Sequence, residues 1–446
     1  MSRLLKDSFL VVGTKIIALL LGFVSSIFFI RLLGPDGKGV LTLIEIAVGF
    51  FMILTTFNIN LSLIHFIAKE KLPTEKLLGV AFIVIGISLL SSLTVLTVLY
   101  FLGYLDLLLP LENLKTNVIL LAILLVINEI KEVLSAFLRG SKSFEDLYKS
   151  TLYYSFLRLF LFGGLFFWSH YYDNYISEFV LFCLHIVTII FITLSILRFF
   201  KTKYSWRIDF KITWLELRPL LLFSGIGFLT AILNFLSLRI DIWLVDNFLS
   251  IEQVGFYAIA LGLSEMVAQI PGALRTVLLP YLSSAKNREE RMEILLFFSR
   301  ITVSVTLMIS IALFFMADWL VPFIYGEAFV SVVTPFKIIL FSMVIFSFKG
   351  IFIMYNIARD LQRVSFWSNI VAILILIPFG LFLIPNYGIE GAALAVLISF
   401  TVSTLFIFVS VMMIDKLPLR NYFVITKKEW RPAVNFIMSM LSRKQN

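Results

Sequence analysis

The sequence is poor in the residues on which metal, redox and nucleotide chemistry depend. Of its 446 residues one is cysteine, three are histidine and only 15% are charged. The lone Cys183 excludes an intramolecular disulfide, and His65, His170 and His185 are too scattered to form a metal-binding motif. No P-loop, glycine-rich nucleotide fingerprint or nucleophile elbow occurs. We therefore expect no metal site, no catalytic residues, no bound cofactor and no ATP hydrolysis by this chain.

Long apolar runs dominate what is present. Hydrophobic residues make up 60% of the chain, far more than a water-soluble domain needs for its core. Runs of roughly 20 apolar residues, each long enough to cross about 30 Å of hydrocarbon, recur to the end. The first run follows Arg3 and Lys6 and lacks a small-residue cleavage site, which predicts an uncleaved span. About twelve spans are predicted, near residues 8–30, 40–67, 77–102, 117–138, 150–168, 177–197, 219–246, 255–282, 294–317, 334–356, 367–384 and 391–414.

Basic residues near the span ends predict the orientation. Lys and Arg concentrate in alternate segments, beginning with the N-terminus, whereas the intervening segments contain only Arg31, Lys38 and Lys115. Since positively charged loops stay in the cytoplasm, both termini are predicted to be cytoplasmic, in a multi-pass protein of the cytoplasmic (inner) membrane. The net charge of +9 is spread over short loops rather than one solvated face, which favours anionic membrane lipids over nucleic acid as partners.

A basic, aromatic segment divides the chain into two halves. Residues 198–218, RFFKTKYSWRIDFKITWLELR, follow the sixth span, and their alternation of aromatic and basic residues is typical of a segment in the membrane interface. The short apolar stretch near the C-terminus indicates an interfacial anchor. We predict an N-terminal six-helix lobe (1–200), a basic cytoplasmic linker (201–218), a C-terminal six-helix lobe (219–414) and a basic cytoplasmic tail (415–446).

The two halves contain a weak internal repeat. LGPDGKGVL at residues 33–41 aligns with LSIEQVGFY at residues 249–257; in each, a span ends, a turn with an acidic residue follows and a glycine opens the next span. Because each half has an even number of spans, the repeats would be related by an axis along the membrane normal. The sequence therefore predicts an all-α integral membrane protein with two six-helix lobes around a central cleft.

Many charged residues fall inside the predicted spans, where each costs roughly 2.5–3.5 kcal/mol near the bilayer centre. Those near span ends, such as Lys15 and Arg158, could snorkel to the interface. Arg239 and Asp241 could each pair with other helices and so stabilise the packing. Glu129, Lys131 and Glu132 could mark where the fourth span meets the cytoplasm. The other interpretation of the set is a polar cavity within the membrane. The full set is Lys15, Glu45, Glu129, Lys131, Glu132, Arg158, Arg239, Asp241, Glu265, Arg275, Lys337 and Lys349.

Three spans also carry stripes of small and polar residues at helical spacing. Close helix packing is one interpretation, and a wet lumen is the other, which the mixture of charged and amide side chains favours. Pro271 removes a backbone hydrogen bond within the eighth span and, with Gly272, predicts a kink or hinge. The stripes are Lys15, Ala18, Gly22 and Ser25; Gly227, Ala231, Asn234, Ser237 and Asp241; and Gly262, Glu265, Gln269, Gly272 and Thr276.

An enzyme acting on lipid-linked sugars would usually need a hydrophilic loop that carries catalytic carboxylates, histidine or arginine. The longest loops on the predicted outer side, 103–116 and 318–333, are short and have no such pattern. A membrane glycan polymerase or ligase is therefore less favoured than a secondary carrier.

Three segments resemble a known family. RLLGPDGKGVLTLI, following the first span, resembles polysaccharide flippases of the Wzx (RfbX-like) type. So do LSLRIDIWLVDNFLSIEQVGFYAIALGLSEMVAQIPGALRTVLLPYLS, at residues 236–283, and NYGIEGAA, at residues 386–393. These flippases belong to the multidrug/oligosaccharidyl-lipid/polysaccharide (MOP) exporter superfamily, together with multidrug (MATE) extruders and the lipid II flippase. Lipid II flippases usually have two further helices, for which this chain leaves no room.

The resemblance implies MATE-like lobes and alternating access that moves a polyprenyl-pyrophosphate-linked oligosaccharide to the outer leaflet for cell-surface polysaccharide biosynthesis. Its implied partners are that lipid-linked oligosaccharide, a polysaccharide polymerase and glycosyltransferases. Cations suit a pyrophosphate in a low-dielectric cleft, and arginine can bind it bidentately. The candidate ligands are Lys15, Arg158, Arg239, Arg275 and Lys349.

Acidic residues in the spans have two interpretations. On the flippase hypothesis Glu45, Asp241 and Glu265 are candidates for coupling to an H⁺ or Na⁺ gradient, or for charge pairing with the cations. A multidrug or other small-solute exporter of the same superfamily would instead use them for cationic solutes. Basic and acidic residues in the spans are nearly balanced, so their number leaves both transport hypotheses open.

Overall fold

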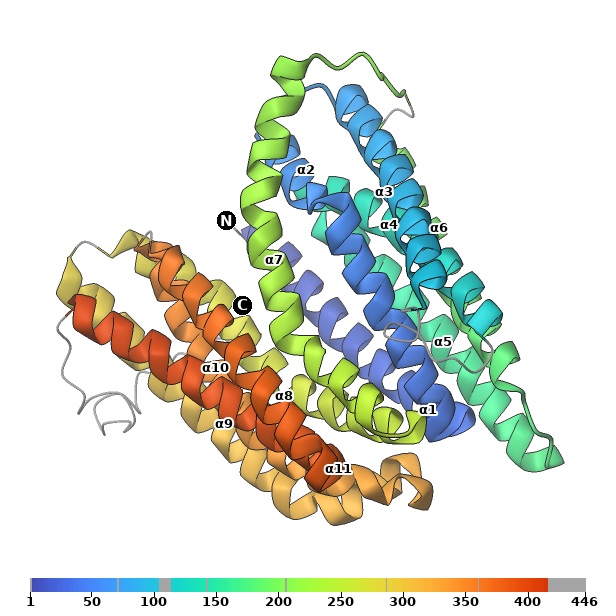
Figure 1. The fold of residues 1–446 in the computed structure, drawn as a ribbon. Coiled ribbons are helices and arrows are strands. Elements are labelled where there is room, and N and C mark those ends of the chain that lie inside the picture. The colour runs from blue at the N-terminus through green and yellow to red at the C-terminus, as the bar shows by residue number, and fades with distance from the viewer. Residues whose placement is uncertain are drawn as a thin grey trace. The chain divides into compact units, whose positions relative to one another are not determined.

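The structure, a computed structural model, consists of helices joined by short connections (Figure 1). It describes residues 2–69, 72–103, 114–141, 143–204, 207–285, 287–359 and 361–415, and these contain no β-strand. The predicted all-α class is confirmed. The α-helices are α1 (Ser2–Thr56), α2 (Ile59–Ala68), α3 (Thr74–Leu102), α4 (Leu114–Gly140), α5 (Phe144–Tyr172), α6 (Glu178–Lys203), α7 (Trp214–Phe248), α8 (Ile251–Ser284), α9 (Arg288–Tyr325), α10 (Val333–Ala358) and α11 (Gln362–Asp415), with a 3-10 helix at Glu327–Val332.

Apart from residues 57, 58 and 177, the predicted spans lie within these helices. α1 and α11 contain two spans each, joined at kinks where Gly34 (φ 72°) and Gly388 (φ 60°) adopt a conformation that residues with a side chain rarely take. The second span is itself interrupted, because Phe57 and Asn58 have positive φ angles and separate α1 from α2. Nine helices in the described part of the chain are long and apolar enough to cross a membrane. The protein is therefore a multi-pass membrane protein.

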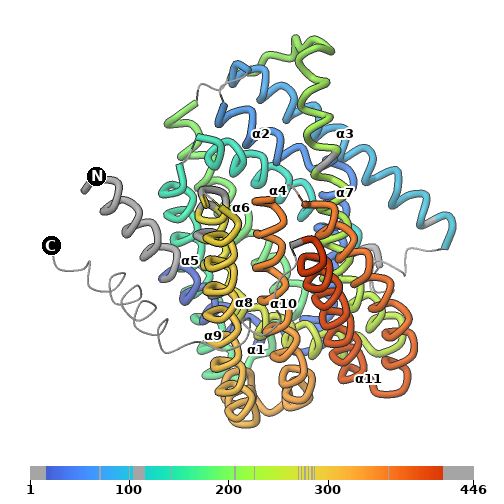
Figure 2. Tube along the Cα trace, turned by 90° about the vertical axis from the view of Figure 1, so that its left-hand side faces the viewer, coloured from blue at the N-terminus to red at the C-terminus, as the bar shows by residue number. Residues whose placement is uncertain are grey.

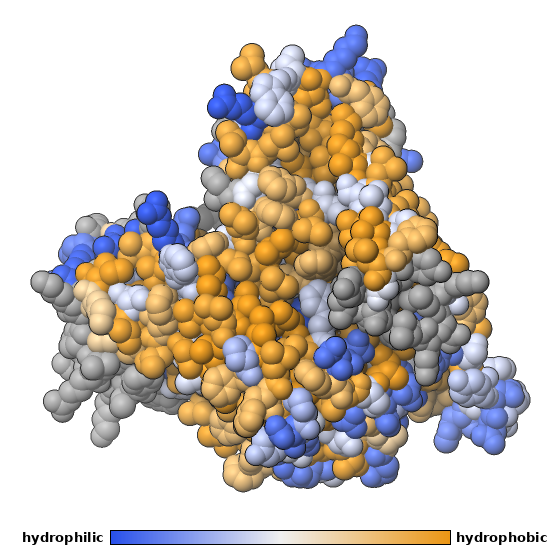
Figure 3. All heavy atoms as spheres, viewed as in Figure 1, coloured by the Kyte–Doolittle hydropathy of each residue, from blue (hydrophilic) through white to orange (hydrophobic). Residues whose placement is uncertain are grey.

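The surface of this protein is apolar, unlike that of a water-soluble one, while its interior is also largely apolar. Large apolar side chains such as Leu90, Phe101 and Phe160 are strongly exposed, and in Figure 3 hydrophobic residues cover most of the helix surfaces, with hydrophilic ones near the helix ends. Small hydroxyl residues lie between helices beside the buried apolar residues. Ser62 of α2, for example, donates a hydrogen bond to the carbonyl oxygen of Leu220 at 2.8 Å. Such contacts satisfy polar groups where no water is present and let helices approach closely.

The stripe of small and polar residues on α1, which includes Ala18, Gly22 and Ser25, packs against α5 and does not line a lumen. Ser155 of α5 donates a hydrogen bond to the carbonyl oxygen of Ala18 at 3.0 Å. Its hydroxyl lies 3.6 Å from the position that a Cβ on Gly22 would occupy. Ala18 and Ser25 are buried. The wet-lumen interpretation is therefore corrected here, because the small residues of α1 serve to admit α5. The side chain of Lys15 lies outside the described part of the chain.

The chain divides into two compact units. Unit 1 is Met1–Phe256 with Phe323–Phe329, and unit 2 is Tyr257–Pro322 with Val330–Asn446. In unit 1, α4 packs against α2 and α6 (Figure 2), and α7 packs against α1 and α2. Unit 1 contains α7 as well as the first six spans, so the boundary between the two compact units does not fall at the linker. The predicted lobes and linker therefore stay a prediction, and the tail beyond residue 415 lies outside the described residues.

Within unit 1 the two repeat segments pack against each other reciprocally. A Cβ on Gly39 would lie 2.1 Å from the carbonyl oxygen of Ile251, and a Cβ on Gly255 would lie 1.9 Å from that of Pro35. In the predicted alignment Gly39 corresponds to Gly255, and Pro35 to Ile251. Each glycine therefore faces the counterpart of its own upstream residue, as expected for two segments related by a local two-fold axis. Nearby, Arg31 donates hydrogen bonds to the carbonyl oxygens of Phe323 and Ile324 at 2.5 and 2.7 Å.

The segment between α6 and α7 is attached to α3. The backbone N–H of Asp209 donates to the carbonyl oxygen of Glu75 at 3.0 Å, and a Cβ on Gly79 would lie 2.0 Å from the carbonyl oxygen of Asp209. Lys76 forms a salt bridge with Glu216 at 2.5 Å, and Glu216 completes a capping box with Thr213 at the start of α7. These contacts explain why α7 belongs to unit 1.

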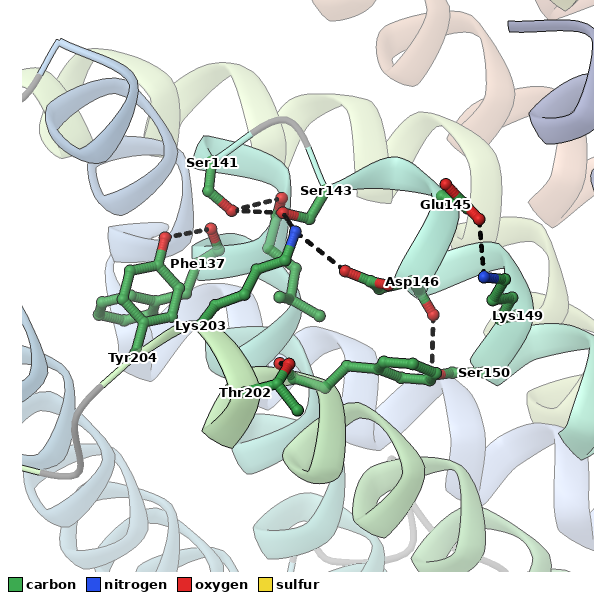
Figure 4. A network of polar contacts seen from close by, with 12 residues as sticks. Phe137, Ser141, Ser143, Glu145, Asp146, Lys149, Ser150, Thr202, Lys203 and Tyr204 are labelled. Atoms are coloured by element: carbon green, nitrogen blue, oxygen red, sulfur yellow. Dashed lines mark hydrogen bonds and ion pairs between the residues drawn. The ribbon is translucent and has the colours of Figure 1, made fainter. Parts of the chain in front are cut away.

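A polar network fixes the turn between α4 and α5 against the end of α6 (Figure 4). Lys203 donates a hydrogen bond to the hydroxyl of Ser143 and forms a salt bridge with Asp146 at 3.0 Å. Glu145 pairs with Lys149 one turn further along α5 at 2.6 Å. All these side chains lie at helix ends, so the network holds a connection in place and leaves the intramembrane charges to other contacts.

Candidate functional site

Glu45 and His185 form one polar contact inside the helices of unit 1. Glu45 lies on α1, beyond the Gly34 kink, and its Oε1 is 3.4 Å from Nε2 of His185 on α6. The Glu45 side chain is 47% exposed, whereas that of His185 is 6% exposed and stacks on Phe29 at 5.3 Å between ring centroids. A carboxyl within a predicted span is thus accessible on one side and oriented by a buried imidazole on the other.

Arg158 lies in an aromatic environment on α5. Its guanidinium stands 5.4 to 5.6 Å from the ring centroids of Phe29, Tyr154 and Phe162, and Nη1 donates a hydrogen bond to the Tyr154 hydroxyl at 3.1 Å. Its Nε has no hydrogen-bond partner among the described residues, and none of their carboxylates forms a salt bridge with it. Cation–π contacts orient the group while leaving N–H donors available to an anion.

Lys38 and Arg239 complete this group. Lys38 is close enough to Glu45, Arg158 and Arg239 for their charges to interact. We call Lys38, Glu45, Arg158, His185 and Arg239 the unit 1 charge cluster. Sequence reasoning placed Lys38 in an outer loop and considered His185 only as a metal ligand. The spacing of Lys38 and Glu45, two helical turns apart on the same face, was a signal that could have identified Lys38. Nothing in the sequence indicated that His185 would meet Glu45.

Asp241 is separated from this cluster by helix geometry. It lies two residues after Arg239 on α7, which places the two side chains on nearly opposite faces of the helix. Asp241 is only 3% exposed, whereas Arg239 is partly exposed. Arg239 is therefore related to the cluster through Lys38, and Asp241 lies buried on the other face of α7.

Unit 2 holds Arg275 and Lys349 in different surroundings. Arg275 of α8 lies 5.7 Å from the ring centroid of Phe346, and its stem occupies the space beside Gly350, where a Cβ would be 2.7 Å from Cδ. Lys349 of α10 is 3% exposed and donates hydrogen bonds to Asn369 Oδ1 and Ser403 Oγ of α11, both at 3.2 Å. Of the two predicted phosphate ligands, only Arg275 is accessible, because Lys349 is enclosed between α10 and α11.

α8 continues as a helix through Pro271 and Gly272, so no break is observed there, and the hinge stays a prediction. On the same helix Glu265 is partly exposed and Gln269 is exposed, and a Cβ on Gly262 would meet nothing within 4 Å. Unlike the stripe on α1, this stripe faces open space in unit 2. No group of His, Cys, Asp and Glu that could hold a metal ion occurs among the described residues.

Comparison with solved structures identifies the fold. An inward-facing multidrug resistance MATE family transporter of the MOP superfamily matches with a TM-score of 0.69 at 13% identity, over 90% of this chain and 98% of that one. The lipid II flippase MurJ, in an inward closed conformation, matches with a TM-score of 0.67 at 18% identity, over 92% and 88%. The Vibrio cholerae MATE transporter VcmN in its bent form gives 0.59 at 16%, over 93% and 98%. The chain has the fold of these two MATE transporters and of the lipid II flippase.

The family follows from the sequence. The model of the family described as "Polysaccharide biosynthesis protein" matches residues 28–334, which is more than half of the chain. The chain therefore belongs to the polysaccharide biosynthesis protein family. No curated protein sequence matches it. The matched region includes the unit 1 charge cluster and Arg275, and it ends before Lys349.

Proposed function

We propose that the protein is a flippase that moves a polyprenyl-pyrophosphate-linked oligosaccharide from the cytoplasmic to the outer leaflet by alternating access. It would act in the cytoplasmic membrane with both termini inside, after glycosyltransferases and before a polysaccharide polymerase. Family membership supports a role in polysaccharide biosynthesis, and the MATE-like and MurJ-like fold supports transport. Neither feature names the transported lipid, so the argument for a pyrophosphate comes from the site.

The observation that carries the proposal is that Arg158, within a predicted span, has no salt-bridge partner among the described residues. Holding a guanidinium inside the membrane is costly, and among the described residues no carboxylate pairs with this one. Three aromatic rings contact its guanidinium, and the charges of Lys38 and Arg239 are near. A diphosphate would supply the missing negative charge and accept two parallel hydrogen bonds from Arg158. Arg275, whose stem is accommodated by Gly350, is a second candidate ligand.

One observation favours a second function, the export of cationic solutes. Glu45 keeps nearly half of its side chain exposed although it lies within a predicted span, and an exposed carboxyl in an apolar surrounding attracts organic cations. On the flippase proposal the same residue is a candidate for ion coupling, as is Glu265 on α8, while the buried Asp241 is the least accessible of the three. We also propose that a gradient of H⁺ or Na⁺ drives the transport.

The test is ligand binding to purified protein in nanodiscs, measured by native mass spectrometry or thermal shift. The ligands are a short polyprenyl diphosphate, the matching monophosphate and a lipophilic cationic drug. We expect the diphosphate to bind best, and Arg158→Ala, Arg239→Ala and Arg275→Ala each to weaken it by about tenfold, or about 1.4 kcal/mol. Arg139→Ala is the control, because Arg139 pairs with Glu132 at 2.6 Å outside the cluster. Binding of the drug alone would refute the flippase proposal and direct attention to Glu45.

A further inference from the structure

Glu129 is a buried carboxyl that the proposed site does not use. It lies in the middle of α4 and is 1% exposed. Its Oε1 makes a hydrogen bond with the hydroxyl of Ser88 on α3, and its Oε2 has no hydrogen-bond partner in the part of the chain that the structure describes. An ionised carboxylate in such a place is strongly disfavoured unless a cation or several donors compensate it.

Ser88 continues into a chain of hydroxyl groups. Its Oγ lies 2.5 Å from Oγ1 of Thr55 on α1, and Thr55 Oγ1 lies 2.6 Å from the carbonyl oxygen of Phe51. The chain from Glu129 to Phe51 therefore contains three hydrogen bonds, and each needs one proton. The two hydroxyls supply one proton each and the Phe51 carbonyl supplies none. All three bonds form together only when Glu129 carries a proton and donates it toward Ser88.

Other charged groups around α4 are engaged elsewhere. None of those in the described residues forms a salt bridge with Glu129, whose hydrogen-bond partner there is Ser88. Lys131, the nearest in sequence, donates to Asn128 at 2.6 Å. The described charged and titratable side chains on α4 and on the helices packed against it are Arg31, Asp36, Lys38 and Glu45 on α1, His65 on α2, Glu75 and Lys76 on α3, Lys131, Glu132 and Arg139 on α4, Glu145, Asp146, Tyr148, Lys149, Tyr153, Tyr154, Arg158, His170, Tyr171 and Tyr172 on α5, and Glu178, Cys183, His185, Arg198, Lys201 and Lys203 on α6.

We propose that Glu129 is the site at which the transporter binds a proton, and that Ser88 and Thr55 transmit its protonation state to the junction of α1 and α2. When the proton leaves, Ser88 must donate to the carboxylate and Thr55 to Ser88, so the bond from Thr55 to the Phe51 carbonyl is lost. Thr55 stands in the last turn of α1, directly before Phe57 and the change of helix direction. A metal ion is a poor alternative ligand, because hard cations require several oxygen ligands and the described chain offers only two hydroxyls and the carboxyl.

Infrared difference spectroscopy of the full-length protein in nanodiscs tests proton binding directly. At neutral pH we expect the carbonyl stretch of a protonated carboxyl, absent in Glu129→Gln and shifted in Ser88→Ala, which keeps the carboxyl but removes its partner. The glutamine amide can donate to Ser88 as the protonated acid does, so this variant should fold. The matched control is Glu132→Gln, three residues along the same helix, where the carboxylate pairs with Arg139. A spectrum without the band, or a band that persists in Glu129→Gln, overturns the inference.

A second measurement tests whether this proton drives transport, which rests on the proposed function. In proteoliposomes an imposed proton gradient should stimulate movement of a fluorescent polyprenyl diphosphate by wild type and by Glu132→Gln. Glu129→Gln should bind the diphosphate with unchanged affinity and lose the stimulation. Stimulation that survives in Glu129→Gln, or that is absent from wild type, refutes coupling through Glu129. If wild type binds no diphosphate at all, the proposed function fails, while the infrared band still decides whether Glu129 binds a proton.

Discussion

Arg275 and Gly350 show how one residue makes room for another on a neighbouring helix. A Cβ at position 350 would stand 2.4 Å from Nη1 and 2.7 Å from Cδ of Arg275, both far below van der Waals contact. The absence of a side chain on α10 therefore allows the guanidinium to lie over Phe346. Sequence reasoning selected Arg275 for its charge and family-like context, but it gave Gly350 no role.

The first prediction concerns this pair. Gly350→Ala is expected to displace the Arg275 side chain and to weaken binding of the polyprenyl diphosphate by about tenfold, as much as Arg275→Ala. Binding in nanodiscs measures the effect. Gly86→Ala is the matched control, because a Cβ there would meet nothing within 4 Å. A folded Gly350→Ala protein that binds with wild-type affinity would show that the observed position of Arg275 does not matter for the ligand.

Contacts between whole elements explain the internal repeat better than its sequence does. The turn after the first span meets the beginning of α8 through Gly39 and Gly255. A Cβ built on either glycine would lie less than 2.5 Å from a backbone carbonyl oxygen of the other segment. A side chain at either position would force the backbones apart. The two segments share little beyond a leucine, an acidic residue in the turn and this glycine, and of these the contact requires the glycine, which accounts for the weakness of the repeat.

The second prediction follows at this scale. Gly39→Ala and Gly255→Ala should each lower the stability of the purified protein by about 1–3 kcal/mol, since overpacked backbone must shift. The double variant should lose less than the sum, because both substitutions open one shared contact. Thermal unfolding in detergent measures all three proteins, with Gly164→Ala as the control that meets no neighbour. Fully additive losses would contradict a single reciprocal contact.

At the scale of the whole molecule, the distribution of charged residues predicts how the protein is oriented in the membrane. The packing of the helices does not. The turn between α5 and α6 is rich in exposed tyrosine, with Tyr175 at 84% exposure, whereas the opposite end of α6 carries Lys201 and Lys203. Basic residues remain in the cytoplasm and aromatic residues favour the interface. The end of α6 that belongs to the polar network of Figure 4 is therefore expected to be cytoplasmic.

The third prediction tests this orientation by cysteine labelling. In a Cys183→Ser background, Tyr175→Cys should react with a membrane-impermeant maleimide in intact cells. Lys201→Cys should react only after the membrane has been permeabilised. The cysteine-free protein serves as the control for nonspecific labelling. The opposite pattern would invert the topology and with it the direction of the proposed transport.

The sequence by itself determined the helices, because their causes are local. Apolar runs of membrane length require helices, and Gly34 and Gly388 mark kinks where a positive φ is needed. Most of the charged residues inside the spans were also identified from the sequence, since composition shows which residues are costly in a membrane, but Lys38 was placed in a loop. The break at Phe57 and Asn58 was missed, because phenylalanine rarely adopts a positive φ angle and an asparagine inside an apolar run is a weak signal for one.

Only the tertiary structure decided what each intramembrane charge does, because partners come from distant parts of the chain. Lys349 and Arg275 look alike in sequence, yet one is enclosed by Asn369 and Ser403 and the other lies beside a glycine and an aromatic ring. Glu129 resembled the edge of a span until Ser88 and Thr55 were found beside it. The energy of a buried charge depends on the atoms within a few ångströms, and packing between helices supplies those atoms.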